Sequence, residues 1–500
     1  MSISTPGTKR NPDGIRTPSY HQTAERLHAA VAAKRSVAAE VASEPRSGSP
    51  WEKTNKITPA LSRVDLRRLA YGRRAASRKI LVRHAGGETL GFEPIKLPRC
   101  ARCGQPVESG VGVMTNGEKA RFTGTMLCGS IWACPTCSAI IRHERAHEVA
   151  LAIGNHAEKL RREAADQWQA DHEGWQLPPE LAVSEGFGYY LFGTLTLRHD
   201  KTMPLAMTLD AILKGWTKLI NGKPWKKAVK RWKIRGFVRA IEVTYGRNGW
   251  HPHIHFVIFL DGELDAEQQQ AMHDWMLDRW KTMVERVAKA YRKQDGNPYN
   301  VAPNDEHGID LQFKAGKDAG TAAAEYITKV QGDKGSVTLA QEIARGDIKD
   351  GRVGSVNPFQ LLDAGCLGLS DFQREDLWLE YWQATLRRRC ITWSRGLKED
   401  MEVEELEDEE LAQKADELPG LVGYVVPNRV YKDVRKRTPE LLADALEAAE
   451  HEDWQEVARL LPGGVILTDE QQDMIADGDA KPGDFLPGIA MGIDTVSGLI

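Results

Sequence analysis

Hydrophobic positions between about residues 185 and 332 follow two spacings that separate strands from helices. Runs rich in β-branched and aromatic residues predict strands, and apolar positions three or four residues apart predict helices. The predicted order is strand 188–198, helix 205–232, strand 236–245, strand 251–260, helix 265–292, strand 309–314 and helix 319–330. This order predicts an α+β fold in which helices flank an antiparallel sheet.

The strands 236–245 and 251–260 are separated by Gly246-Arg247-Asn248-Gly249, a polar turn that predicts a β-hairpin. His253 and His255 lie two apart on the second strand, so their side chains point to the same face. A turn centred on the middle of the polar segment places Glu242 across from His253. Two imidazoles and a carboxylate form a three-ligand site suited to Mg²⁺ or Mn²⁺. A register slip would leave His251 as the substitute third ligand, and a partly buried histidine-rich strand is the alternative interpretation.

Residues 321–329 form an alanine-rich stretch that predicts the start of a helix. Tyr326 then lies one turn before Lys329 on a shared face. A phenol needs a nearby cation or metal to become an effective nucleophile toward phosphate. Tyr326 is therefore the candidate nucleophile, and an ordinary amphipathic helix is the alternative.

A basic helical stretch, 216–235, carries Trp225, Val229 and Trp232 at helical spacing. These apolar residues predict a helix face that packs on the sheet. The candidate DNA-binding residues, which would contact phosphate from the other face, are Lys226, Lys227, Lys230 and Arg231.

Two C-x-x-C pairs about thirty residues apart predict a zinc-ribbon-like site. Its four expected ligands are Cys100, Cys103, Cys134 and Cys137. Cys128 and His143 are substitutes, and thiol redox chemistry is the alternative. Because four thiolates leave no open coordination position, the zinc is expected to be structural.

The ordered set Thr194–Leu197, Ile241–Thr244, His251–His255 and Tyr326–Lys329 resembles the rolling-circle replication initiators of bacterial plasmids. These belong to the HUH endonuclease superfamily, and the staphylococcal and actinobacterial type is the most similar. The resemblance covers roughly residues 95–397. It implies a ferredoxin-like or RRM-like core that nicks one strand of origin DNA.

By this resemblance His253 and His255 are metal ligands, Tyr326 is the nucleophile and Lys329 is a phosphate or transition-state partner. The products are a 5′-phosphotyrosine and a free 3′-hydroxyl that primes synthesis, and reversal rejoins the strand at termination. Some members carry a glutamate one helical turn before the tyrosine, where this chain has Ala322.

The 500 residues carry a net charge of −3, so overall charge does not indicate nucleic acid. Residues 62–83 are strongly basic, however, and residues 399–410 are mostly acidic, which predicts a basic approach to DNA through the first segment. No GxxxxGK[ST] phosphate loop occurs, so a host helicase and polymerase are expected partners. The absence of a signal-like or membrane-spanning run favours a reducing cytoplasm.

The expected domain organisation has five parts: a largely disordered region 1–58, a basic helix with zinc knuckles 59–150, the catalytic domain 185–397, an acidic linker 398–419 and a helical C-terminal appendage 420–500. Three other functions fit parts of the pattern. A rolling-circle transposase usually carries two catalytic tyrosines, and a relaxase usually carries its tyrosine near the N-terminus. A non-catalytic zinc-dependent DNA-binding regulator would bind an origin without metal-dependent nicking.

Overall fold

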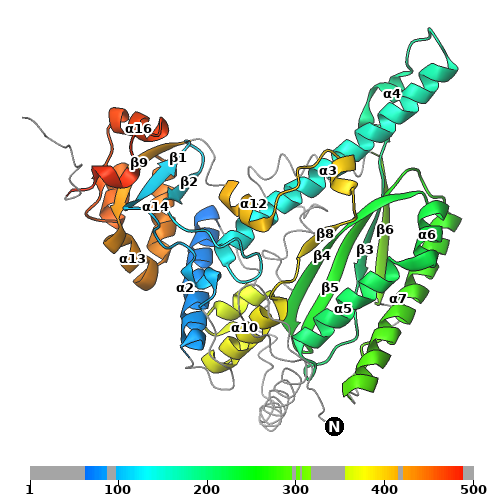
Figure 1. Cartoon of the computed structure of the whole chain (residues 1–500), viewed down its shortest axis with the longest axis horizontal. Coiled ribbons are helices and arrows are strands. Elements are labelled where there is room, and N and C mark those ends of the chain that lie inside the picture. The colour runs from blue at the N-terminus through cyan, green and yellow to red at the C-terminus, as the bar shows by residue number, and fades with distance from the viewer. Residues whose placement is uncertain are drawn as a thin grey trace, which may run out of the picture.

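The computed structural model describes residues 62–86, 97–295, 300–303, 307–316, 355–414 and 420–487. These residues form mixed α/β structure with two antiparallel sheets. A large lobe holds one sheet and a small lobe holds the other, and helices α2 (Arg63–Ala85) and α10 (Asp371–Thr385) lie between them (Figure 1). The predicted helix with Tyr326 and Lys329, the predicted disordered region 1–58 and the far C-terminus from residue 488 lie outside the described residues.

The large sheet runs in the order β6-β3-β5-β4-β7, with β8 also paired to β4. All of its pairings are antiparallel, and β4 and β5 form the central hairpin. Gly249, after the turn, has a φ of +82°, and a Cβ there would lie 2.7 Å from the Cα of Lys201. Glycine therefore permits the tight hairpin. The strands are β3 (Tyr189–Leu195), β4 (Ile234–Gly246), β5 (Gly249–Leu260), β6 (Ile309–Ala315), β7 (Ser355–Val356) and β8 (Ile391–Trp393).

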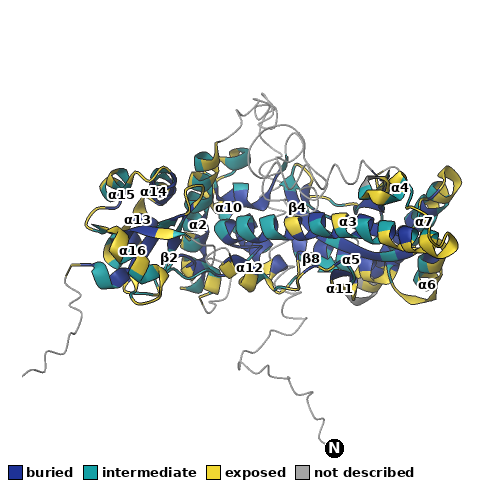
Figure 2. Ribbon diagram, turned by 90° about the horizontal axis from the view of Figure 1, so that it is seen from above, coloured by how far each residue is buried: buried dark blue, intermediate teal, exposed yellow. Residues whose placement is uncertain are grey.

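Helices cover both faces of this sheet because β5 is apolar on both faces over its second half. On one face Phe256 packs beside Trp216 of α5 (Leu205–Leu219), with α7 (Ala266–Asp295) alongside. On the other face Phe259 and Val257 pack against α3 (Pro135–Asp171), including Ile153. Figure 2 shows α3 running along the sheet. The apolar contact with α3 stops at Val257, and the histidines of β5 lie beyond it on the same face.

The single helix expected at 205–232 is two helices, α5 and α6 (Gly222–Arg231). Pro224 lacks the N–H that a continuous helix requires, and Gly222 adopts a φ of +82° at the break. Arg279 of α7 donates hydrogen bonds to the carbonyls of Lys218, Leu219 and Asn221, which satisfies the end of α5. The break turns α6 away from the axis of α5 (Figure 1).

The small lobe combines segments that lie about 300 residues apart in the sequence in a sheet of order β10-β9-β1-β2. Its strands are β1 (Gly110–Thr115), β2 (Ala120–Thr123), β9 (Leu421–Pro427) and β10 (Val465–Ile466), and its helices are α13 (Asn428–Arg437), α14 (Glu440–Glu450), α15 (Trp454–Leu460) and α16 (Asp469–Ala476). This differs from the expected separate units at 59–150 and 420–500, because β9 pairs with β1. Pairing between such distant segments leaves no local sequence pattern.

The acidic segment expected to be a linker, 398–419, instead packs on α3 over its described part. It contains α11 (Leu397–Asp400) and α12 (Asp408–Lys414), and Leu411 of α12 is buried in the main core. Arg145 of α3 binds Asp408 at 2.8 Å. Elsewhere in the chain, the short helix α4 (Pro179–Ala182) follows α3.

The basic helix α2 uses its arginines to join the two lobes. Arg63 and Arg67 both bind the carboxylate of Glu450 in α14, whose side chain is 2% exposed. Toward the large lobe Arg73 binds Asp363 at 2.6 Å, and Arg83 binds Glu375 of α10. The expected basic approach to DNA through residues 62–83 is thus mostly a set of ion pairs within the protein.

Candidate metal sites

Glu242, His253 and His255 form a compact cluster at one end of the central hairpin. Glu242 pairs with His253 across the hairpin, so the expected register is confirmed. Nε2 of His253 lies 3.1 Å from Oε2 of Glu242, and Nε2 of His255 lies 2.9 Å from the same oxygen. Adjacent ligands of an octahedral ion with bonds of about 2.1 Å lie about 3.0 Å apart. Among the described residues, this is one of two clusters with ligand atoms close enough to hold a metal ion.

Groups outside the cluster orient both imidazoles. Nδ1 of His255 lies 3.1 Å from Oγ1 of Thr194 on the neighbouring strand β3. Nδ1 of His253 lies 3.4 Å from the backbone carbonyl of His251. A proton on each Nδ1 leaves the lone pair of each Nε2 directed at the cluster centre, as metal-binding histidines require. The two ligand separations at Glu242 therefore match those expected around a divalent ion such as Mg²⁺ or Mn²⁺.

His251, the expected substitute ligand, is not part of this cluster. Its ring stacks on His199, with centroids 4.5 Å apart and planes 13° apart, and approaches His253 at 5.0 Å. Burial lowers the pKa of His199, which favours its neutral form. The sequence reasoning missed His199, although its position four residues after β3 is a signal for the same end of the sheet.

The second cluster consists of Cys103, Cys128, Cys134 and Cys137, all buried. The Sγ atom of Cys137 lies 3.6 Å from that of Cys103 and 3.7 Å from that of Cys128. A tetrahedral zinc with Zn–S bonds of about 2.3 Å separates its sulfurs by about 3.8 Å. The four thiols therefore fit a structural zinc site.

This ligand set corrects the one expected from the sequence, because Cys128 takes the place of Cys100. Cys100 lies within the 3₁₀ turn η2 (Arg99–Arg102) and is half-buried. Its thiol is not among the four sulfurs that lie close enough together to share one ion. The substitute His143 is not in the cluster. Only the fold of the loop before α3 brings Cys128 to Cys137.

Two buried arginines lie beside the cysteine cluster. Arg74 of α2 packs against Gly104, which follows Cys103, and its Nη2 has no hydrogen-bond partner among the described residues. Arg435 of α13 donates two hydrogen bonds to the carbonyl of Cys103. Zinc with four thiolates carries a net charge of −2, and two guanidinium groups compensate such a charge in a low-dielectric interior. The surroundings therefore fit zinc as well as the ligands do.

Comparison with known proteins identifies the family. A family model described as "Replication protein" matches residues 180–300, which contain the hairpin cluster. A protein described as "Protein rep" from Streptomyces lividans is 31% identical over 407 residues, which cover 70% of this chain and 81% of that protein. This chain belongs to the replication-protein family. The resemblance to plasmid replication initiators drawn from the sequence is thereby confirmed.

A second relative of this replication protein is described as "Neomycin resistance protein" from Streptomyces cyanogenus. It is 27% identical over 196 residues, which cover 32% of this chain and 38% of that protein. No solved structure is significantly similar to the replication protein. No helix among its described residues is long and apolar enough to span a membrane.

The basic residues expected to bind DNA lie on α6, within the region that the family model matches. Lys226, Lys227, Lys230 and Arg231 are all exposed. Trp232 is buried and Trp225 packs at the edge of the same core, as the helical spacing predicted. Figure 2 shows α6 as an exposed end of the large lobe. In this replication protein α6 thus presents a cationic face to solvent.

Tyr326 and Lys329, the expected nucleophile and its phosphate partner, lie outside the described residues, which stop at Gly316 and resume at Ser355.

Proposed function

We propose that this protein initiates rolling-circle replication of a plasmid by metal-dependent nicking of one strand of origin DNA. The observation that carries the proposal is the cluster of Glu242, His253 and His255, with ligand separations that fit an octahedral divalent ion. It lies on the central hairpin of the region that matches the replication-protein family. The lobe at 185–397, with its antiparallel sheet and flanking helices, is then an HUH endonuclease catalytic domain.

The residues of the cluster hold their positions before DNA binds. Their backbone belongs to two long paired strands, and Thr194 fixes the ring of His255 from a third. Such preorganisation means that little reordering is needed when the phosphate arrives. A Mg²⁺ or Mn²⁺ ion bound here would polarise the scissile phosphate and orient it for in-line attack.

Tyr326 is proposed as the nucleophile. Its phenolic oxygen loses its proton and forms a bond to phosphorus while the bond from phosphorus to the 3′-oxygen breaks, and the 3′-oxygen takes up a proton. The DNA 5′ end is then esterified to Tyr326, and the free 3′-hydroxyl serves as the primer. Lys329 is proposed to stabilise the charge of the phosphate. Attack by a 3′-hydroxyl on the phosphotyrosine reverses these steps and rejoins the strand.

The exposed cations of α6 are proposed to hold the backbone of the DNA strand that leads to the cluster. Their charge contributes affinity that is independent of sequence and falls as salt rises. Unwinding and synthesis are assigned to a host helicase and polymerase, because the nicking reaction itself needs no nucleotide. Zinc at the cysteine cluster is proposed to be structural, since four thiolates fill its coordination sphere.

The test uses the full-length protein with Mn²⁺ and 3′-labelled oligonucleotides that tile both single strands of the DNA next to its gene. We expect one oligonucleotide to give a labelled protein band on a denaturing gel, and we expect EDTA to abolish it. The band should disappear in Tyr326→Phe and in the double variant His253→Ala/His255→Ala.

Matched controls separate the site from general damage. Tyr189→Phe removes the hydroxyl of a half-buried tyrosine in β3, and His273→Ala/His451→Ala removes one histidine of α7 and the histidine that follows α14. Both controls should retain the adduct. A band that persists in Tyr326→Phe refutes the assigned nucleophile, and a complete lack of adduct with tight duplex binding favours a non-catalytic regulator.

A further inference from the structure

Exposed positive charge on the small lobe is concentrated on α13. Arg429, Lys432 and Lys436 are exposed, and they form no ion pair within the part of the chain that the structure describes. Five arginines of α2, by contrast, are bound to carboxylates: Arg63, Arg67, Arg68, Arg73 and Arg83. The basic helix that is prominent in the sequence is thus mostly neutralised internally, whereas α13 carries uncompensated charge on the small lobe.

The helix α13 is held firmly against the lobe. Tyr431 is 1% exposed and contacts Phe122 of β2 edge to face, with ring centroids 5.2 Å apart. Arg435 points inward and donates to the carbonyl of Cys103 in the cysteine cluster. Asn428, at the start of the helix, donates to the carbonyl of Glu108. Because its inner face is anchored at three places, the outer face can bind a ligand without reordering the helix.

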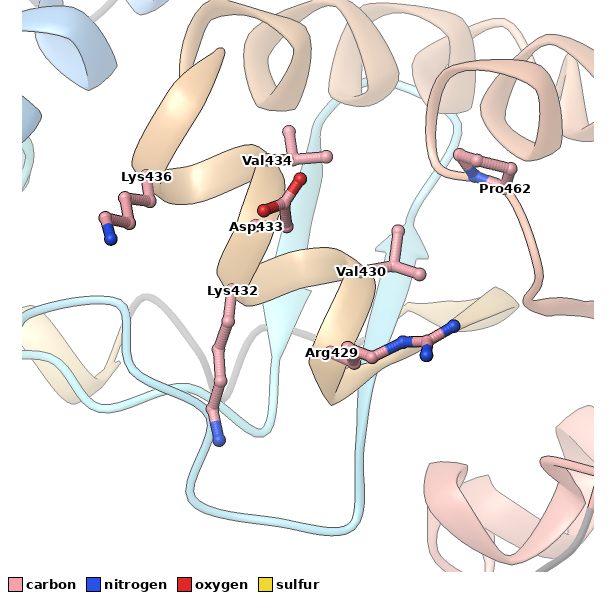
Figure 3. Close-up of a pocket in the computed structure, with 7 residues that line it drawn as sticks. All are labelled: Arg429, Val430, Lys432, Asp433, Val434, Lys436 and Pro462. Atoms are coloured by element: carbon pink, nitrogen blue, oxygen red, sulfur yellow. The ribbon is translucent and has the colours of Figure 1, made fainter.

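The three cations border a groove of about 620 Å³. Its other lining residues are Val430, Asp433, Val434 and Pro462. Figure 3 shows the cationic side chains extending from successive turns of α13, with Pro462 across from Val430. Asp433 forms an ion pair with Arg437 at 3.0 Å, so its negative charge is already balanced. The groove therefore presents net positive charge around a small apolar floor.

We propose that this outer face of α13, defined by Arg429, Lys432 and Lys436, is a binding surface for double-stranded DNA. The three positions follow the spacing i, i+3 and i+7, so they share one helix face and span about 10 Å. Phosphates of one strand of duplex DNA advance about 3.4 Å along the axis per step, so about three phosphates fit this span. No aromatic side chain lines the groove, whereas surfaces for single strands usually stack bases on aromatic rings.

This surface lies on the small lobe, away from the hairpin cluster on the large lobe (Figure 1). The inference rests on the proposed function in one respect, because an initiator must hold duplex DNA beside the strand that it cuts. The surface would anchor the flanking duplex while the large lobe takes the single strand. Binding through α13 therefore requires neither Mn²⁺ nor Tyr326.

The test measures binding of the full-length protein to a labelled mixed-sequence duplex of about 30 base pairs by fluorescence anisotropy over a range of salt concentrations, without Mn²⁺. The test variant is Arg429→Ala/Lys432→Ala/Lys436→Ala. The control Lys119→Ala/Arg162→Ala/Lys289→Ala removes three exposed charges from scattered places. We expect the α13 variant to bind at least about tenfold more weakly and its salt slope to fall by about 2–3, at about 0.9 per phosphate contact. The control should stay close to wild type.

A conservative variant, Arg429→Lys/Lys432→Arg/Lys436→Arg, should retain wild-type binding. That result would show that positive charge on α13 is the cause of the affinity for DNA. An unchanged salt slope in the alanine variant overturns the inference, as does an equal loss in the scattered control. Full competition by poly-glutamate at the same charge concentration as DNA would also overturn it, because the surface would then suit an acidic protein. The adduct assay with single strands distinguishes the two proposals: the α13 variant should still form the adduct, and a lack of adduct in wild type leaves the duplex result standing.

Discussion

Replacement of single cysteines tests which four thiolates form the zinc site. In the structure Cys128 lies within zinc-ligand distance of Cys137, at 3.7 Å between sulfurs, and Cys100 is outside the cluster. Structural zinc sites bind with about 10–16 kcal/mol, so one of four thiolates accounts for about 2.5–4 kcal/mol. We expect Cys128→Ser to weaken zinc binding by about 10²–10³-fold. Cys100→Ser should leave the affinity within about twofold of wild type.

Zinc affinity can be measured by competition with a chromophoric chelator at fixed pH, and Co²⁺ substitution reports the coordination directly. Cobalt with four thiolates absorbs strongly in the visible range, and the loss of one thiolate shifts the band. Wild type and Cys100→Ser should give the same spectrum, and Cys128→Ser a shifted one. The reverse pattern, or equal losses in the two variants, would refute the assignment of Cys128 and restore the ligand set expected from the two C-x-x-C pairs.

Three further predictions concern the large lobe and the junction between lobes. Burial lowers the pKa of His156 to about 3 from its ordinary 6.5. Below pH 6.5 this residue takes up a proton in the unfolded chain but stays neutral in the folded protein, so the free energy of unfolding falls as the pH falls. Urea denaturation at pH 7 and 5 should show a difference of about 2 kcal/mol that His156→Leu removes; an unchanged difference would contradict it. Thr194→Val should lower Mn²⁺ affinity about 10–100-fold by calorimetry, because His255 loses its orienting partner; normal affinity would argue against that role. Glu450→Gln should destabilise the small lobe by about 3–5 kcal/mol and expose it to proteolysis, whereas Glu456→Gln, in an ion pair at the surface of α15, should not.

The hairpin cluster was predictable because its information is local. Glu242 and the two histidines are separated by one tight turn, and the alternation of strands fixes which side chains share a face. Thr194 and His199 were not predicted as part of the site. They reach it through the pairing of β3 with β5, which joins Thr194 to His255 across sixty-one positions of sequence.

The cysteine site was predictable in kind but not in membership. Two C-x-x-C pairs indicate zinc because their spacing suits one ion. Spacing alone does not show whether a cysteine outside the pairs replaces one of their members as a ligand. The short loop before α3 decides the matter by bringing Cys128 to Cys137. The arginines that balance the charge, Arg74 and Arg435, come from α2 and α13 and lie far away in sequence.

Charge was the property that the sequence described least well. A run of basic residues at 62–83 has the same composition whether it binds DNA or carboxylates of the same chain. In the folded protein most of its arginines meet acids of α10 and α14, because these helices pack against α2. The exposed charge remains on α6 and α13, and burial of one face of each helix determines which cations stay at the surface.

The sequence by itself determined local elements of this replication protein: the histidine hairpin, the long helix that follows it and a set of cysteines suited to a metal ion. These depend on interactions between residues that are close in sequence, so the spacing of hydrophobic and polar residues predicts them. Only the tertiary structure decided that the two ends of the described chain form one small lobe, that Cys128 replaces Cys100, and that α2 is a connector. Each of these results depends on contacts between distant segments, and their energies arise only when the core is assembled.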